Sequence, residues 1–315
     1  MASRSFVSRL RQGDEIARLA TFLCAASVVL ITVLLVFELW RQSALPRHAF
    51  GFKFFLTRVW DPIAEQFGAL PFIYGTLVTA AVALIIAVPL GIGAAIFLAE
   101  LAPLRLSDPL QFLIDLLAAV PSVIYGFLGF FVVVPLMRDW IAPALKKSLG
   151  FLPLFQGPAY GVGFLTAGVV LAIMVIPYII SVSREVLLSV PRDQREAALA
   201  LGATRWESTW KVVVPFARSG IMGSIFLALA RALGETMAVT MVIGNTPTIS
   251  ASLFSSGYSI AAVIANEFTE ATGDLYLQSL IELGLVLFLL TFILNGLARL
   301  MMLLTTRRGT GMGNA

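Results

Sequence analysis

The sequence predicts an all-α membrane protein with six membrane-spanning helices. Of its 315 residues, 59% are hydrophobic and only 13% are charged, and the mean hydropathy is +0.92. A water-soluble domain of this length carries far more charge, so the balance indicates a chain that crosses a membrane several times. Because lipid offers no hydrogen bonds to the backbone, each crossing is expected to be a helix.

Six apolar runs are each long enough to cross about 30 Å of hydrocarbon. They cover residues 19–40, 72–98, 110–136, 162–182, 220–243 and 280–304. The first run follows a polar tail, residues 1–18, and resembles a secretory signal peptide. It is too long for one and has no clear small-residue cleavage site, so we expect a retained anchor. The helical core is then residues 72–304, followed by a tail at 305–315.

The distribution of Lys and Arg predicts how the chain is oriented. Six spans place both termini on the same side, together with the connection 184–218, and this side carries 14 Lys and Arg residues. The opposite side, which includes the connections 41–71 and 244–279, carries 7. Cytoplasmic connections are the positive ones, so both termini and residues 184–218 are predicted to be cytoplasmic. The net charge of +4 thus reflects orientation and does not indicate a nucleic-acid-binding face.

Several kinds of chemistry have no counterpart in the sequence. It contains no GxxxxGK[ST] phosphate-binding loop, and no HExxH, CxxC or GxSxG motif, so we expect no enzymatic activity and no cofactor or metal bound by this chain. Cys24 is the single cysteine, which excludes a disulfide within the chain, and its apolar neighbours predict a buried thiol. Pro89, Pro121 and Pro177 lie inside the apolar runs, where we expect them to kink or interrupt helices.

The fifth apolar run contains two charged residues, Arg231 and Glu235. A charge at the centre of a bilayer costs roughly 2.5–3.5 kcal/mol, so this pair is expected to be functional or strongly compensated. Their spacing of four residues places them on one face of a continuous helix. With Ser224, Ala228 and Ala238 they form a small or polar stripe that could face either another helix or a narrow hydrated pathway.

The connection 184–218 predicts two short helices separated by a tight turn. The segment REAALAL favours a helix, and Gly202 supplies the left-handed residue that ends it. Thr204 and Glu207 match a capping box that starts the next helix. From its physical chemistry alone, this segment could be an elbow lying on the membrane, with Trp206 and Trp210 as interfacial anchors.

The same segment carries a specific resemblance. Glu196-Ala197-Ala198, Gly202 and Pro215 are spaced as in the EAA motif of ABC importer permeases, EAA-x3-G-x9-I-x-L-P, with valine in place of the Ile and Leu. The resemblance implies an ABC importer permease (MetI-like) fold. It also implies that residues 196–202 form a coupling helix that docks on an ATPase subunit, which a secondary transporter would not need.

Four further stretches narrow the resemblance: FGALPFIYGTL, AVPLGIGAAIFLAELAP, LLAAVPSVIYGFLGFFVVVPL and RALGETMAVTMVIGN. They are similar to permeases of phosphate-specific ABC transporters, nearer to the C-type than to the A-type subunit, over residues 50–308. This implies a multi-pass protein of the bacterial inner membrane that moves inorganic phosphate. The implied partners are an A-type permease, two ATPase subunits that carry ATP and magnesium, and a periplasmic phosphate-binding protein. Another oxyanion, such as sulfate or molybdate, stays open as the substrate.

Within this resemblance, Arg231 and Glu235 acquire a second interpretation. The planar guanidinium of Arg231 could bind two phosphate oxygens, while Glu235 orients and partly neutralises it. The alternative is a structural ion pair that holds the helices together. The sequence alone leaves both interpretations open.

Overall fold

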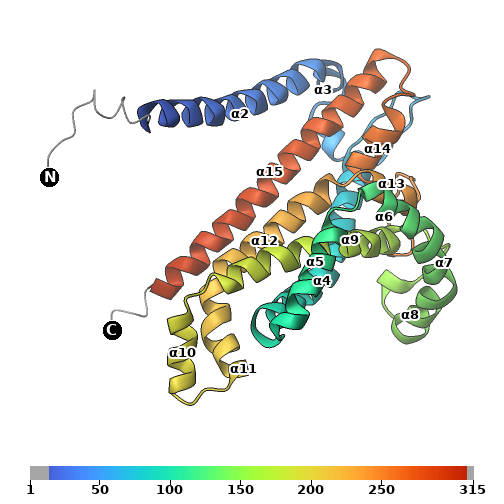
Figure 1. The fold of residues 1–315 in the computed structure, drawn as a ribbon. Coiled ribbons are helices and arrows are strands. Elements are labelled where there is room, and N and C mark those ends of the chain that lie inside the picture. Colours follow the sequence, from blue (N-terminus) through green and yellow to red (C-terminus); the bar gives the residue numbers. More distant parts are fainter. Residues whose placement is uncertain (1–13, 311–315) are drawn as a thin grey trace.

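The computed structural model describes residues 14–310, and in that range the chain folds into helices joined by loops, without a β-sheet (Figure 1). Six helical stretches are long and apolar enough to cross a membrane. They are Ala17–Gln42, Leu70–Leu101, Ser122–Leu149, Phe164–Leu188, Arg205–Gly234 and Asp274–Leu300. The prediction of an all-α, six-span fold is therefore confirmed.

Helix α9 (Phe164–Leu188) is the centre of the bundle, and 61% of its most apolar window is buried. Helix α4 (Leu70–Ile96) packs along α9, and two glycines allow the close approach. A Cβ on Gly168 would lie 2.4 Å from Val82, and one on Gly91 would lie 2.7 Å from Ile179. Small residues bring membrane helices together in this way because dispersion contacts have to replace the hydrophobic effect.

Helix α2 (Asp14–Gln42) is the most isolated span. In Figure 1 it meets α15 (Asp274–Thr310) only near its C-terminal end and then runs away from the bundle. None of its most apolar window is buried within the chain. Cys24 lies on this helix and is exposed, so the prediction of a buried thiol is wrong. An apolar neighbourhood in sequence does not bury a side chain when its helix has no neighbour in the same chain.

The third predicted span, residues 110–136, is not one helix. Helix α5 (Leu104–Ala118) ends before Pro121, and α6 (Ser122–Leu128) begins after it. Proline lacks the N–H that a continuing helix needs, and it disfavours helical geometry in the preceding residue. Pro121 interrupts the run as expected, whereas Pro89 and Pro177 lie inside continuous helices.

From Leu128 onward the third span contains wide turns. After α6 come a π turn, η3 (Gly129–Val133), the short α7 (Val134–Leu136), a second π turn, η4 (Met137–Ile141), and α8 (Ala142–Leu149). Two more π turns, η2 (Phe97–Leu101) and η6 (Thr209–Val213), end α4 and precede α12. Each of the four ends two residues before a proline, at Pro103, Pro135, Pro143 or Pro215. Proline cannot donate the backbone hydrogen bond of a regular helix, and its ring clashes with the preceding turn. A wider π turn makes room for the ring.

The remaining elements lie at the two ends of the bundle (Figure 1). Helices α3 (Ala44–Phe50) and α14 (Ile260–Glu267) lie at one end with the 3₁₀ turn η1 (Gly51–Phe55), beside the start of α15. The short turn η5 (Pro153–Phe155) lies in the connection between α8 and α9. Helices α10 (Arg192–Ala200) and α11 (Arg205–Ser208) project from the opposite end, where α15 also ends.

The fifth apolar run also differs from its prediction. Residues 220–243 were expected to form one span, but the structure has two helices there, α12 (Val214–Gly234) and α13 (Met237–Ile243). Glu235 between them is extended, with φ −71° and ψ 130°. The sixth span begins at Asp274 and not at residue 280, because a polar first turn precedes its apolar part.

Candidate functional site

The segment with the EAA spacing forms the helix–turn–helix that its residues predict. At the end of α10, Gly202 has φ +87°, in the left-handed region. The N–H of Ala203 donates to the carbonyl of Ala198 at 3.1 Å, and the N–H of Gly202 donates to that of Leu199 at 3.0 Å. These two bonds form a Schellman motif, in which glycine is favoured at the left-handed position.

The capping box that starts α11 is also present. The Thr204 side chain accepts a bond from the N–H of Glu207 at 3.2 Å, and Glu207 Oε2 accepts one from the N–H of Thr204 at 3.0 Å. The two caps fix the angle between α10 and α11. The EAA segment is thus a defined turn at the end of the bundle and not an irregular loop.

The surface of this segment is mostly polar, but two leucines at its end are exposed. Glu196 and Ala197 are exposed. Leu201 is 91% exposed at the tip of the turn, and Leu199 beside it is 44% exposed. These neighbouring leucines make the turn a candidate for contact with another protein. Sequence reasoning missed Leu201, although its position inside the EAA spacing was a usable signal.

Arg195 joins this segment to the membrane helices, and it too was missed from the sequence. Its Nη2 lies 2.8 Å from Glu100 Oε1, in the turn η2 that ends α4. The same guanidinium donates to the backbone carbonyl of Leu187 at 2.7 Å and to that of Val190 at 2.5 Å. Arg195 therefore connects α10 to the ends of both α4 and α9.

A buried apolar cluster lies under the same corner. It contains Ile96 from α4, Leu187 from α9 and Val213 from η6, just before Pro215. Pro215 itself is exposed near the start of α12. Arg195 and this cluster thus place α10 in contact with the ends of α4 and α9, and next to η6, which precedes α12.

Arg231 lies in the last turn of α12 and is partly buried. Its guanidinium carbon is 4.3 Å from the centre of the Tyr178 ring on α9, a cation–π contact that is worth about 2 kcal/mol when desolvated. Its Nε is buried without a hydrogen-bond partner in the described part of the chain. The Tyr178 hydroxyl donates to the carbonyl of Ala118 at 2.8 Å, at the end of α5. The cation therefore stands beside the break between α5 and α6, with an unused donor.

Glu235 does not share a helical face with Arg231, and this part of the prediction is wrong. The helix ends at Gly234, and Glu235 Oε1 accepts a bond from the N–H of Ala238 at 3.3 Å, in the first turn of α13. Between residues 14 and 300 no ion pair joins Arg231 to Glu235. Glycine weakens the helix, and the carboxylate is better placed beside the free N–H groups that start the next one.

The small and polar stripe on the fifth run faces a helix of the same chain over most of its length. Ser224 and Ala228 are buried, and the hydroxyls of Ser224 and Ser183 on α9 lie 2.7 Å apart. Arg231, further along, is only partly buried. Among the described residues, no group of three or more His, Cys, Asp or Glu side chains could hold a metal ion.

Sequence comparison relates the chain to membrane components of binding-protein-dependent transporters. The family model described as "Binding-protein-dependent transport system inner membrane component" matches residues 87–302. The chain is 48% identical over 285 residues to the phosphate transport system permease protein PstC of Mesorhizobium japonicum, covering 88% of this chain and 87% of that protein. It is 52% identical over 262 residues to the PstC protein of Xylella fastidiosa, covering 82% and 81%.

Solved structures with a similar fold belong to other importers. A bacterial alginate ABC transporter, solved with its alginate-bound periplasmic protein, matches with a TM-score of 0.59 and 14% identity, covering 92% of this chain and 96% of that one. The inward-facing MetNI methionine ABC transporter matches with a TM-score of 0.54 and 16% identity, covering 78% and 98%. At these identities the likeness concerns the fold, which is that of an ABC importer permease.

Proposed function

Because the chain belongs to the family of binding-protein-dependent transport system inner-membrane components, we propose that it is the membrane permease subunit of an ATP-driven phosphate importer. It is a multi-pass membrane protein, and we place it in a bacterial inner membrane. Its role is to conduct inorganic phosphate, delivered by a periplasmic binding protein, to the cytoplasm. The observation that carries the choice of phosphate is the 48–52% identity to PstC proteins over more than four-fifths of the chain.

The proposed assembly contains an A-type permease and two ATPase subunits, on which ATP and magnesium are bound. Leu199 and Leu201, exposed at and just after the end of α10, support an ATPase contact at residues 196–202, because contact with a partner would remove both side chains from water. The contacts of Arg195 support the next step, in which movement of the ATPase reaches the membrane helices. Through Glu100 it would pass a movement of α10 to α4 and α9.

We place Arg231 on the phosphate pathway. A guanidinium stays charged throughout a transport cycle and offers a planar fork for two phosphate oxygens. Its stacking on Tyr178 and its free Nε support this role, because ring contact orients the group without using its donors. Glu235 is assigned a different task from the one its spacing indicated: it stabilises the start of α13 beside the helix break.

The experiment that tests the substrate is uptake of labelled phosphate in cells that lack other phosphate carriers. Expression of this chain with its partner subunits should restore uptake, and excess sulfate or molybdate should not compete. Competition by sulfate or molybdate, with weak uptake of phosphate, would instead make it a permease for another oxyanion.

A further inference from the structure

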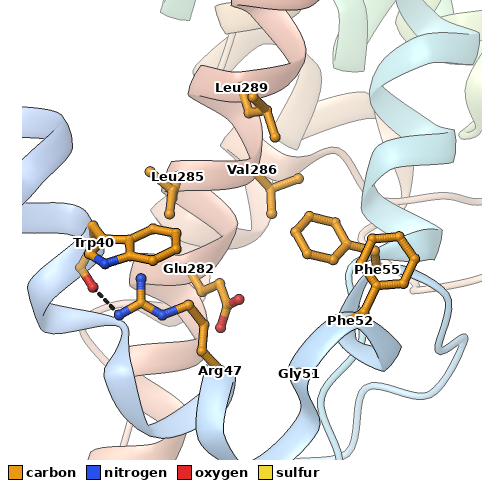
Figure 2. A pocket seen from close by; sticks show the side chains of 9 residues that line it. All are labelled: Trp40, Arg47, Gly51, Phe52, Phe55, Glu282, Leu285, Val286 and Leu289. Atoms are coloured by element: carbon orange, nitrogen blue, oxygen red, sulfur yellow. Dashed lines mark hydrogen bonds between the residues drawn. The ribbon is translucent and has the colours of Figure 1, made fainter.

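A pocket away from the proposed phosphate pathway lies between the end of α2, the short elements α3 and η1, and the first turns of α15 (Figure 2). It encloses about 250 Å³. Its apolar walls are Trp40, Phe52, Phe55, Leu285, Val286 and Leu289. Two charged side chains, Arg47 and Glu282, lie at one end of the pocket, and the three aliphatic residues follow α15 away from them (Figure 2).

Both charged groups have unused hydrogen-bonding capacity. Glu282 is only 2% exposed, and its Oε2 has no hydrogen-bond partner in the described part of the chain. Arg47 stacks on Trp40, with its guanidinium carbon 3.7 Å from the ring centre, and its Nη2 donates to the Trp40 carbonyl. Its Nη1 is buried without a partner among residues 15–300. The two groups form no ion pair with each other, so a buried donor and a buried acceptor of opposite charge stand unsatisfied beside one another.

The chemistry of the pocket selects the charge of its occupant. A simple anion would be attracted by Arg47 but repelled by Glu282, and a simple cation would meet the opposite conflict. A dipolar group with a phosphate at one end and a protonated primary amine at the other satisfies both. The phosphate oxygens can accept from Arg47, and the ammonium hydrogens can be donated to Glu282.

The position of the pocket indicates a membrane lipid as the source of that group. Trp40 lies near the end of α2, and Glu282 lies about 12 Å along α15 from Asp274, counting 1.5 Å per residue. Tryptophan at a helix end and exposed aromatic residues mark the headgroup level of a bilayer. Phe52, at the rim of the pocket, is 76% exposed. An acyl chain can leave the charged end and follow the apolar walls toward Leu289.

We propose that this pocket binds an aminophospholipid of the phosphatidylethanolamine type, with Arg47 on its phosphate and Glu282 on its ammonium group. The bound lipid connects α2, which has few contacts within the chain, to α15. This proposal does not depend on the transported substrate.

The test uses the full chain purified with the subunits that accompany it, depleted of lipid and then mixed with synthetic phospholipids of identical acyl chains. Native mass spectrometry measures which lipid is retained. We expect phosphatidylethanolamine to be retained about tenfold more tightly than phosphatidylcholine, whose trimethylated amine cannot donate to Glu282. Phosphatidylglycerol, which lacks the amine, should also be weaker. Excess inorganic phosphate should displace none of them.

The variants separate the two ends of the headgroup. Glu282→Gln should remove the preference for phosphatidylethanolamine over phosphatidylcholine, and Arg47→Gln should weaken both lipids about tenfold. Leu285→Trp fills the pocket without altering its charges and should displace lipid even if Arg47→Gln cannot be purified. The matched control is Arg41→Gln, because Arg41 is an exposed arginine at the same end of α2 and pairs with Glu38 outside the pocket.

Equal retention of the three phospholipids, or unchanged retention in Leu285→Trp, would overturn the proposal. Displacement by inorganic phosphate would assign the pocket to a free anion. If no phospholipid is retained and a cysteine at Phe52 cross-links to another subunit, the pocket belongs to a protein contact and the lipid proposal is wrong.

Discussion

Arg231 is the residue whose chemistry most directly separates a transport role from a structural one. Replacement by lysine keeps the positive charge but loses the planar fork and its stacking on Tyr178. We expect Arg231→Lys to reduce phosphate uptake at least about tenfold, because one charge-assisted hydrogen bond contributes about 1.5–3 kcal/mol. ATP hydrolysis stimulated by the binding protein should persist, and so should assembly. Uptake and ATP hydrolysis are measured on the same reconstituted vesicles.

Tyr178→Phe is the matched control for this prediction. It keeps the ring under Arg231 and removes only the hydroxyl bond to Ala118. Uptake in Tyr178→Phe should stay within about threefold of wild type, the effect of one neutral hydrogen bond. Normal uptake in both Arg231→Lys and Arg231→Gln would remove Arg231 from the pathway.

Gly202 is the residue that tests whether the turn of the EAA segment is needed for the proposed contact with the ATPase. A Cβ at this position would meet no atom within 4 Å, so a substitution acts through the backbone angle and not through a steric clash. The left-handed conformation costs about 1–2 kcal/mol for a residue with a Cβ, and a β-branched residue is least tolerant. We expect Gly202→Val to reach the membrane but to release the ATPase on purification. Gly202→Asn, which tolerates this conformation better, should retain it; equal retention in the two variants would contradict the role of the turn.

At the scale of helices, the ion pair between Arg195 and Glu100 joins α10 to the end of α4. The Glu100 side chain is 10% exposed and that of Arg195 is 20% exposed, so removing one partner leaves a poorly solvated charge. Removing one partner of a buried ion pair lowers the free energy of unfolding by on the order of 3 kcal/mol. We expect Glu100→Gln to keep the ATPase bound and ATP hydrolysis active while uptake falls several-fold.

The exposed pair of Lys211 and Glu207 supplies the control, because its members are 74% and 43% exposed. Lys211→Gln should leave stability and uptake unchanged, because an exposed pair contributes little. A fall in uptake for Lys211→Gln equal to that for Glu100→Gln would show that any charge change in this region disturbs coupling. Recovery of uptake on combining Glu100→Arg with Arg195→Glu would support the pair directly.

The sequence predicts a structural feature well when that feature depends on residues close together in the chain. The turn at Gly202 and the capping box of Thr204 and Glu207 were predicted because each depends on residues within one turn of helix. The break after Gly234 was missed. Hydropathy there is continuous, and the preference of Glu235 for the start of α13 becomes visible only once that helix exists.

Contacts between residues far apart in the chain could not be predicted from the sequence, because they depend on how the helices pack. Arg195 and Glu100 are 95 residues apart, and nothing in either local sequence specifies the other. Burial of Cys24 was predicted from apolar neighbours, but burial depends on packing, and α2 has little of it within this chain. The same limit explains why Leu201 was overlooked, because its importance lies in exposure.

For the whole molecule, the distribution of positive charge predicts the orientation in the membrane. The ends of α4 and α15 lie with α10 and α11 at one end of the bundle, and α3 and α14 lie at the other (Figure 1). The end with α10 carries most of the Lys and Arg residues, 14 against 7 by the sequence count, so we expect it to face the cytoplasm. This predicts that Thr272, before α15, is periplasmic and that Ser189, after α9, is cytoplasmic.

Both Thr272 and Ser189 are exposed, which makes them suitable sites for single cysteines in a Cys24→Ser background. In intact cells, a membrane-impermeant thiol reagent should label Thr272→Cys and should leave Ser189→Cys unlabelled until the cells are permeabilised. Permeabilisation is the internal control, because it shows that the thiol at residue 189 can react. The reverse pattern would place the coupling segment outside the cell, where no ATP-driven partner could dock, and would remove the coupling role of residues 196–202 together with the orientation.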